Sequence, residues 1–241
     1  MTRYLRNGAI AGIGGGAALA LFLLLVGESS ISDAIAIEEA GGHGGDAMFS
    51  RTVQLVGGGV GSLIIGAALG AIFGTVFAAA RHRLPGREDW QRSLWLAAAA
   101  FVTIQLVPAL KYPSNPPAVG DPDTVGQRTG LYVLLVAFMV IAGLATARFA
   151  GWLARRDTTA QTRLMLSAGM WLALVTAALI FFPPAPDPVN APATLVWHFR
   201  MASLGGVLAF WTATSCAFGV LLSPRVAREP STEVPGKTQP S

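Results

Sequence analysis

The chain has 241 residues, of which 53% are apolar and only 12% are charged, about half the charged fraction of a soluble domain. This composition excludes an ordinary soluble fold, because one core could not bury so much apolar surface, and it indicates a protein that uses lipid as its solvent. The net charge is +4, and a single cysteine, Cys216, excludes an internal disulfide and a cysteine-based metal site.

Six apolar runs are long enough to cross a hydrocarbon core of about 30 Å, which needs roughly 20 residues. They lie near residues 8–27, 53–80, 93–110, 130–152, 164–182 and 198–222. The sequence therefore predicts an all-α integral membrane protein, a six-helix transmembrane bundle in one polytopic domain over residues 1–222. Residues 223–241 are rich in Pro, Ser, Thr and charge, which predicts a disordered cytoplasmic tail.

The basic residues predict the orientation of the six helices. With the N-terminus placed inside, the outer loops hold only four of the 17 Lys and Arg residues, and cytoplasmic loops of membrane proteins carry the excess of Lys and Arg. We therefore expect three helical hairpins, with both chain ends in the cytoplasm, in the cytoplasmic (inner) cell membrane. The high pI then reflects topology, and we expect no nucleic-acid partner beside the lipid bilayer.

The first run could instead be a cleaved signal peptide, since Ala34-Ile35-Ala36 loosely fits a small-residue cleavage site. The length of the run and Asp33 within the cleavage region favour a retained helix.

Glycines recur four residues apart on two of the predicted helices. They are Gly8, Gly12 and Gly16 on the first helix, and Gly66, Gly70 and Gly74 on the second. Such spacing puts a flat stripe on one helix face and lets two backbones approach closely. We interpret the stripes as packing surfaces, and a pathway lined by backbone is the alternative.

An arginine stands near the outer start of each returning helix, at Arg51, Arg128 and Arg200. Asp46 and Asp123 each lie five residues before such an arginine, which suggests a threefold repeat of hairpins. An arginine at a helix N-terminus opposes the macrodipole, and near lipid it is costly unless paired. We therefore expect these arginines either to clip loop carboxylates or to organise an outer vestibule.

The segment 108–123 is the most distinctive loop, with five prolines between positions 108 and 122. Prolines at this density exclude helix and sheet, so we expect a stiff loop that exposes backbone carbonyls. Asn115, Asp121 and Asp123 add oxygen ligands to it.

The same loop carries a resemblance to a known family. The residues concerned are Lys111, Tyr112, Pro113, Asn115, Pro116, Pro117, Gly120, Asp121, Pro122, Arg128 and Tyr132. They resemble the signature of the CbtA family, probable cobalt transporter subunits. Phe199-Arg200 and Ser203-Leu204 are similar to its last-helix motif, and the segment with Glu38, His43 and Arg51 is similar to its first outer loop.

The resemblance implies a membrane subunit that takes up cobalt for cobalamin synthesis. It also implies a small single-span, histidine-bearing partner similar to CbtB. Co²⁺ would be cargo, and we expect no resident cofactor.

Candidate metal ligands near the outer face are imidazoles and carboxylates, which suit Co²⁺. They are Glu38, His43, Asp121, Asp123 and His198. The alternative for each is a solvated loop or interface residue, because Lys111, Arg128 and Arg200 repel a divalent cation unless carboxylates neutralise them.

The predicted spans contain no Asp or Glu deep in the membrane, no phosphate-binding loop and no catalytic constellation. We therefore do not expect an enzyme, nor transport driven by the chain's own nucleotide hydrolysis. Two interpretations remain: a metal-ion permease subunit, or a structural or assembly subunit of a larger membrane complex.

Overall fold

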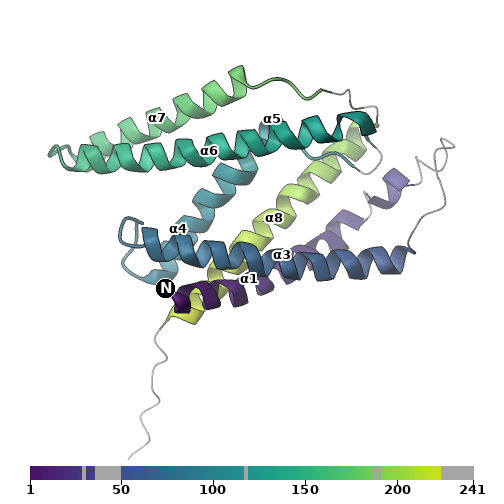
Figure 1. Ribbon diagram of the computed structural model, residues 1–241, viewed down its shortest axis with the longest axis horizontal. Coiled ribbons are helices and arrows are strands. Elements are labelled where there is room, and N and C mark those ends of the chain that lie inside the picture. The colour runs from purple at the N-terminus through teal and green to yellow at the C-terminus, as the bar shows by residue number, and fades with distance from the viewer. Residues whose placement is uncertain (29–30, 36–49, 117–118, 187–188, 190, 224–241) are drawn as a thin grey trace, which may run out of the picture.

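The computed structural model describes residues 1–28, 31–35, 50–116, 119–186, 189 and 191–223. Every regular element in this part of the chain is helical (Figure 1). The elements are α1 (Thr2–Phe22), the π-helix η1 (Leu23–Gly27), α3 (Arg51–Ala80), α4 (Asp89–Phe101), the π-helix η2 (Val102–Leu106), α5 (Val107–Lys111), the 3₁₀-helix η3 (Pro122–Thr124), α6 (Val125–Ala154), α7 (Ala160–Phe181) and α8 (Ala193–Leu222).

The six predicted spans are confirmed as six helices of sufficient length and apolarity to cross a membrane within the described ranges. They run over Thr2–Gly27, Arg51–Ala80, Asp89–Lys111, Val125–Ala154, Ala160–Phe181 and Ala193–Leu222. All six are longer than predicted, and α3 and α7 begin at side-chain caps. The Ser50 hydroxyl accepts from the Val53 N–H at 3.4 Å, and Thr159 caps α7 in the same way.

The two glycine stripes pack against each other, which confirms their interpretation as packing surfaces. A Cβ added at Gly12 would overlap the Gly66 carbonyl oxygen and lie 2.8 Å from the Gly70 Cα. A Cβ at Gly8 or Gly74 would likewise meet the backbone of the other helix. Only glycine allows α1 and α3 to approach this closely.

The main core lies where α8 crosses α1, α3 and α4. Phe218 of α8 is fully buried and meets Phe77 of α3 edge-to-face, with ring centroids 5.2 Å apart and planes at 79°. Phe73 packs on the same ring at 5.4 Å. Such aromatic pairs add roughly 0.5–1.5 kcal/mol beyond the area they bury, so they fix α8 at the centre of this group of helices.

The last two helices do not form a packed pair within the described residues. α7 packs on α6, whereas α8 packs on α1 and α4, and Figure 1 shows α6 and α7 as a separate layer above the others. Of the six candidate spans, α7 is the least buried. The sequence predicts a third hairpin made of α7 and α8. The helix packing does not show it, because these two helices pack on different neighbours.

The start of α1 and the end of α8 lie together. The Asn7 amide donates to the Leu221 carbonyl at 3.2 Å, and Arg3 donates to the Leu222 carbonyl at 3.4 Å. Figure 1 shows α3, α6 and α8 all starting on the opposite side of the bundle. Successive spans therefore start on alternate sides of the bundle, as a chain that crosses a membrane six times requires.

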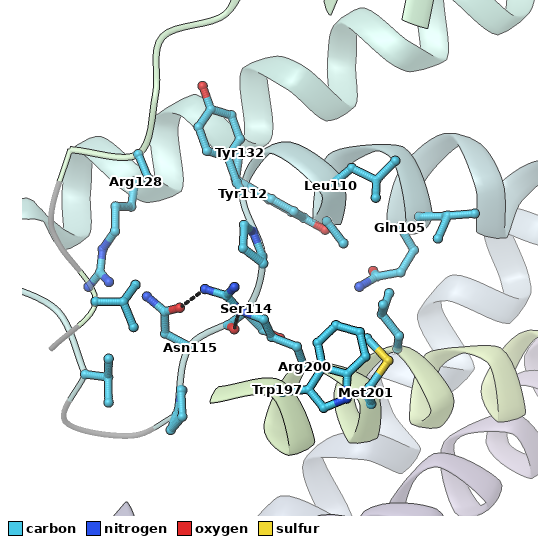
Figure 2. Close-up of a pocket in the computed structure, with 18 of the residues that line it drawn as sticks. Gln105, Leu110, Tyr112, Ser114, Asn115, Arg128, Tyr132, Trp197, Arg200 and Met201 are labelled. Carbon is cyan, nitrogen blue, oxygen red and sulfur yellow. Dashed lines mark hydrogen bonds between the residues drawn. The ribbon is translucent and has the colours of Figure 1, made fainter. Parts of the chain in front are cut away.

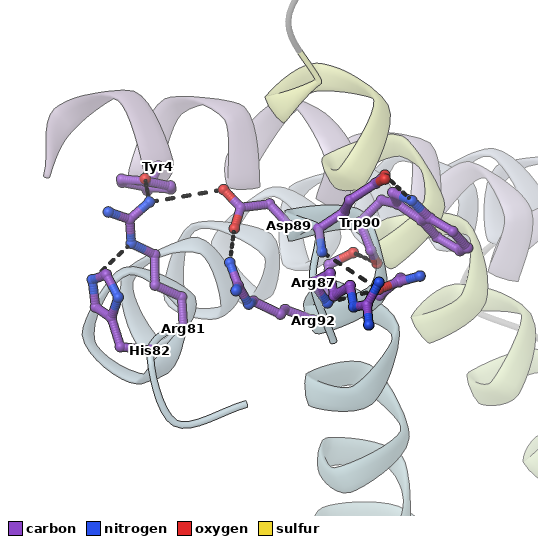
Figure 3. Close-up of polar contacts among 10 residues, drawn as sticks. Tyr4, Arg81, His82, Arg87, Asp89, Trp90 and Arg92 are labelled. Carbon is purple, nitrogen blue, oxygen red and sulfur yellow. Dashed lines mark hydrogen bonds and ion pairs between the residues drawn. The ribbon is translucent and has the colours of Figure 1, made fainter. Parts of the chain in front are cut away.

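A polar cluster joins α1, α3 and α4 at the end of the bundle where the chain begins (Figure 3). Arg81 donates to the Tyr4 hydroxyl at 2.6 Å and lies 3.8 Å from the Asp89 carboxylate. Asp89 also pairs with Arg92 at 2.9 Å. Arginines that the sequence analysis treated only as topology signals therefore also tie three helices together.

Helix continues through Pro108, so the prediction that prolines exclude helix from residue 108 onward is wrong for the first four positions. A regular α-helix would use the N–H of residue 108 to bond the Ile104 carbonyl, and proline has none. The chain adapts with the π-helix η2, in which the Val107 N–H bonds the Val102 carbonyl, and Tyr132 of α6 donates to the Ile104 carbonyl at 3.4 Å.

Candidate binding cavity

A cavity of about 740 Å³ opens between the proline-rich loop and the first turns of α6 and α8 (Figure 2). Most of its lining comes from three segments that are far apart in the sequence. These contribute Gln105, Leu106, Ala109, Leu110, Tyr112, Pro113, Ser114, Asn115, Pro116 and Val119; Val125, Arg128, Thr129 and Tyr132; and Trp197, Arg200, Met201 and Leu204, with Ala185 and Val189 beside them. We call this space the proline-loop cavity.

The two long helices present the same pattern to the cavity. The α6 residues 125, 128, 129 and 132 and the α8 residues 197, 200, 201 and 204 each follow the spacing i, i+3, i+4, i+7, which marks one helix face. Each face carries one arginine at its second position. This shared spacing is a sequence signal that could have revealed Trp197 and Met201, which sequence reasoning missed.

Arg200 holds the proline-rich loop in place. Its Nη2 donates to the Asn115 amide oxygen at 3.1 Å, and its Nε donates to the Ser114 carbonyl at 3.3 Å. Figure 2 shows Arg128, Asn115 and Arg200 in a row along one wall of the cavity. In the described part of the chain, the partners of the Arg200 guanidinium are thus an amide oxygen and a backbone carbonyl, and the role of the three arginines in an outer vestibule stays a prediction.

Lys111 and Tyr112 connect this loop to the end of α7. The Lys111 ammonium donates to the Leu179 carbonyl at 2.8 Å, and the Tyr112 hydroxyl donates to the Pro183 carbonyl at 2.7 Å. The last carbonyls of a helix lack partners within the helix and attract a cation through the macrodipole. Desolvation raises the pKa of Tyr112 above its ordinary value, so the hydroxyl keeps the proton that it donates.

A short turn between the loop and α6 sets the start of that helix. Gly120 has φ of 108°, a conformation that side chains disfavour. The Asp121 carboxylate accepts from the Asp123 N–H at 2.9 Å, and the Asp121 carbonyl accepts from the Thr124 hydroxyl at 2.7 Å. The carboxylate of Asp121 thus helps to order the turn, and the Asp123–Arg128 pairing stays a prediction.

The predicted metal ligands do not come together in the described part of the chain. No group of three or more His, Cys, Asp and Glu residues that could hold a metal ion occurs there. Asp121, Asp123 and His198 are exposed and do not line the cavity. Glu38, His43 and Pro117 of the predicted site, together with Asp46 and residues 224–241 of the tail, lie outside the described residues.

Arg51 lies apart from the proline-loop cavity. Its guanidinium pairs with the Glu28 carboxylate just after η1, with Nη2 and Nε at 2.5 and 3.1 Å from the same oxygen. The expectation that Arg51 pairs with a carboxylate is confirmed, and the partner is Glu28. Both side chains are about a third exposed, so the pair adds at most about 1 kcal/mol.

The lining of the cavity is cationic and partly apolar. The described residues that line it include Arg128 and Arg200 but no Asp, Glu, His or Cys. Its amide, hydroxyl and guanidinium donors can hold an oxyanion, and Trp197 and Met201 give an apolar wall.

These features define a multi-pass α-helical membrane protein with a ligand-sized cavity at the loop end of its bundle. Residues 1–223 match the model of the family described as "Probable cobalt transporter subunit (CbtA)", and the chain belongs to this family. No curated protein and no solved structure matches the chain.

Proposed function

We propose that the chain is the membrane subunit of a cobalt uptake transporter in the cytoplasmic membrane, and that it supports cobalamin synthesis. The family supplies the class, a probable cobalt transporter subunit. The observation that carries the proposal further is the convergence of Tyr112, Asn115, Arg128 and Arg200 on one cavity. Residues that resemble the family signature thus share a location that a passing ligand could occupy.

Inward transport requires the cavity to face outward. The proposed orientation rests on the arginine distribution, since four of the 17 basic residues would lie in outer loops. The contact between Asn7 and Leu221 supports it in part, because it puts both helix ends on one side. Reporter fusions after residue 223 and within residues 113–116 test the orientation, and an outward reporter signal at the C-terminal fusion would contradict it.

Energy for uptake would come from outside this chain. The six helices contain no Asp or Glu in their central turns, and the chain has no phosphate-binding loop. We therefore propose a partner, a small single-span subunit with histidines similar to CbtB, that passes the metal to this chain.

A second candidate is a structural or assembly subunit of a larger complex. It is favoured by α7, whose exposed apolar residues include Leu164, Met165, Leu172, Ile180 and Phe181. In a bilayer this surface meets either lipid or another subunit.

Uptake of ⁵⁷Co²⁺ separates the two functions. Cells would express the chain with and without the partner, and membrane insertion would be confirmed by immunoblotting of the membrane fraction. We expect accumulation above background when both are present. Background accumulation in both cultures, with the protein inserted, would rule out the transporter and leave the structural role.

A further inference from the structure

A second hollow, an open groove, runs along one face of α4 from the loop that joins this helix to α3. Its volume is about 530 Å³, and it is lined by Gly86, Trp90, Gln91, Leu94, Trp95 and Ala98. The helical positions among these recur every four residues, which marks one helix face. It shares no lining residue with the proline-loop cavity. We call it the α4 groove.

The helix side of the α4 groove is apolar and exposed. Trp90, Leu94 and Trp95 keep 44%, 36% and 56% of their surface accessible. They stand in the first turns of the candidate span Asp89–Lys111, where a membrane helix passes from the headgroups into the hydrocarbon. Tryptophan is enriched at that level. An acyl chain that follows the groove from Trp90 toward Ala98 would therefore contact apolar side chains along its length.

Trp90 is held in place at the upper end of the groove. Its indole N–H donates to the Glu88 carboxylate at 2.6 Å. Its backbone packs on α8 so tightly that a Cβ added at Gly219 would lie 3.0 Å from the Trp90 Cα. The groove is thus a fixed surface of the protein.

The mouth of the groove is ordered by a tight turn. Gly86 has φ of 115°, and a Cβ added to it would lie 2.8 Å from the Gln91 Cβ. The Gln91 side-chain oxygen accepts from the Arg87 N–H at 2.9 Å. Figure 3 shows Arg87 and Trp90 on the same flank of the α4 start. The turn therefore places an arginine beside the apolar groove.

The two carboxylates of this region already have partners. Asp89 pairs with Arg92 at 2.9 Å and lies 3.8 Å from Arg81. Glu88 accepts from the Trp90 indole, and both acids stand at the N-terminus of α4, whose macrodipole favours negative charge. The acids thus stabilise the start of the helix.

Arg83 and Arg87 are both exposed, and neither forms an ion pair within the part of the chain that the structure describes. A guanidinium binds phosphate oxygens through paired N–H donors. The tail acids Glu229 and Glu233 lie outside the described residues, so the experiment below includes a chain without them. Two exposed arginines beside an apolar groove match a ligand with an anionic head and an apolar chain.

We propose that the α4 groove binds an anionic phospholipid, such as phosphatidylglycerol. Its phosphate meets Arg87 and Arg83, and one acyl chain lies along Leu94, Trp95 and Ala98. A soluble phosphate would use only the arginines, and a neutral lipid only the groove. The proposal does not depend on cobalt transport or on the direction of insertion, because it requires only that the start of α4 lies at a membrane surface.

Quenching of tryptophan fluorescence by brominated lipid tests the proposal. The full chain is placed in phosphatidylcholine nanodiscs that contain a minor fraction of phosphatidylglycerol, with bromine on the acyl chains of one lipid or the other. The contribution of Trp95 is the difference between the unmodified chain and Trp95→Phe. We expect quenching of Trp95 to report a roughly tenfold preference for phosphatidylglycerol, since two arginines near the surface attract its charge.

Two pairs of variants separate the head site from the groove. Arg83→Gln combined with Arg87→Gln should abolish the preference, and Arg155→Gln is the control, an exposed arginine after α6. Ala98→Phe should reduce it by filling the groove, and Ala99→Phe is the control, because Ala99 is equally exposed but does not line the groove. Thermal unfolding of each variant checks that the fold is retained.

A preference that is lost in the double arginine variant and kept in Arg155→Gln would support the proposal. Equal quenching by both brominated lipids would overturn it, as would an equal loss of the preference in Arg155→Gln or in Ala99→Phe. Absence of quenching by either lipid would mean that protein, such as a second copy of the chain, covers the groove. A preference seen only after deletion of residues 224–241 would make the tail the occupant and would also overturn the proposal.

Discussion

The amide oxygen of Asn115 accepts a hydrogen bond from Arg200 at 3.1 Å, and this contact joins the proline-rich loop to α8 across 85 residues of sequence. The neighbouring Ser114 carbonyl accepts from the same guanidinium. One arginine near the start of α8 therefore fixes the loop that forms a wall of the cavity.

Asn115→Ala should lower the free energy of unfolding by about 1–2 kcal/mol, since a hydrogen bond to a charged group is lost and the wall loosens. Ser114→Ala is the matched control for stability, because Ser114 uses its backbone carbonyl and keeps the bond. A double-mutant cycle with Arg200→Gln, measured by thermal unfolding in detergent, isolates the pair. Additive effects of the two changes would show that Asn115 and Arg200 do not interact.

Gly12→Ala should strongly destabilise the protein. The added Cβ would overlap the Gly66 carbonyl oxygen, and forcing α1 and α3 apart costs about 1–3 kcal/mol as overpacking does elsewhere. Gly58→Ala is the control, because a Cβ at Gly58 has nothing within 4 Å, and alanine in a helix is favoured over glycine by roughly 0.5–1 kcal/mol. Equal melting temperatures for the two variants would contradict the close crossing of α1 and α3.

Tyr132→Phe should cost about 1 kcal/mol, because it leaves the Ile104 carbonyl without the hydroxyl that serves it. In a Pro108→Ala background the cost should shrink, since residue 108 then supplies its own N–H to that carbonyl. Unfolding measurements on the two single variants and the double variant give the coupling. If Tyr132→Phe lowers the free energy of unfolding equally in both backgrounds, the Tyr132 hydroxyl does not compensate for the N–H that Pro108 lacks.

Tyr112→Phe removes the hydrogen bond to the Pro183 carbonyl and should lower stability by roughly 0.5–1 kcal/mol. The pKa of Tyr112 is raised in the folded protein, so the folded state binds this proton more tightly than the unfolded state does. The contribution of the tyrosine is therefore fully present below its unfolded pKa of about 10 and is lost as pH rises above it.

Melting curves of the unmodified chain and of Tyr112→Phe from about pH 6 to pH 11 test this dependence. The difference between them should be constant up to about pH 9 and then diminish. A difference that already changes near pH 7 would mean that another group is responsible.

Much of the fold could be predicted from the sequence because the bilayer constrains it. Long apolar runs gave all six spans, and the spacing of Gly8, Gly12 and Gly16 identified a packing face. Pro108 shows the limit of such local rules, because η2 and the hydroxyl of Tyr132 absorb the missing donor. The motif residues Tyr112, Asn115, Arg128 and Arg200 all line one cavity, but the sequence did not predict the contacts of Tyr112 and Arg200.

The sequence by itself determined the number of helices, their bounds to within a few residues, and the two glycine faces. Hydrophobic length and residue size carry that information directly. Only the tertiary structure decided which helices are neighbours, since lipid and protein interior are equally apolar and an apolar helix face does not specify what covers it. It therefore also decided that α7 packs on α6, that Arg51 meets Glu28, and that Arg200 holds Asn115 at the edge of a cationic cavity.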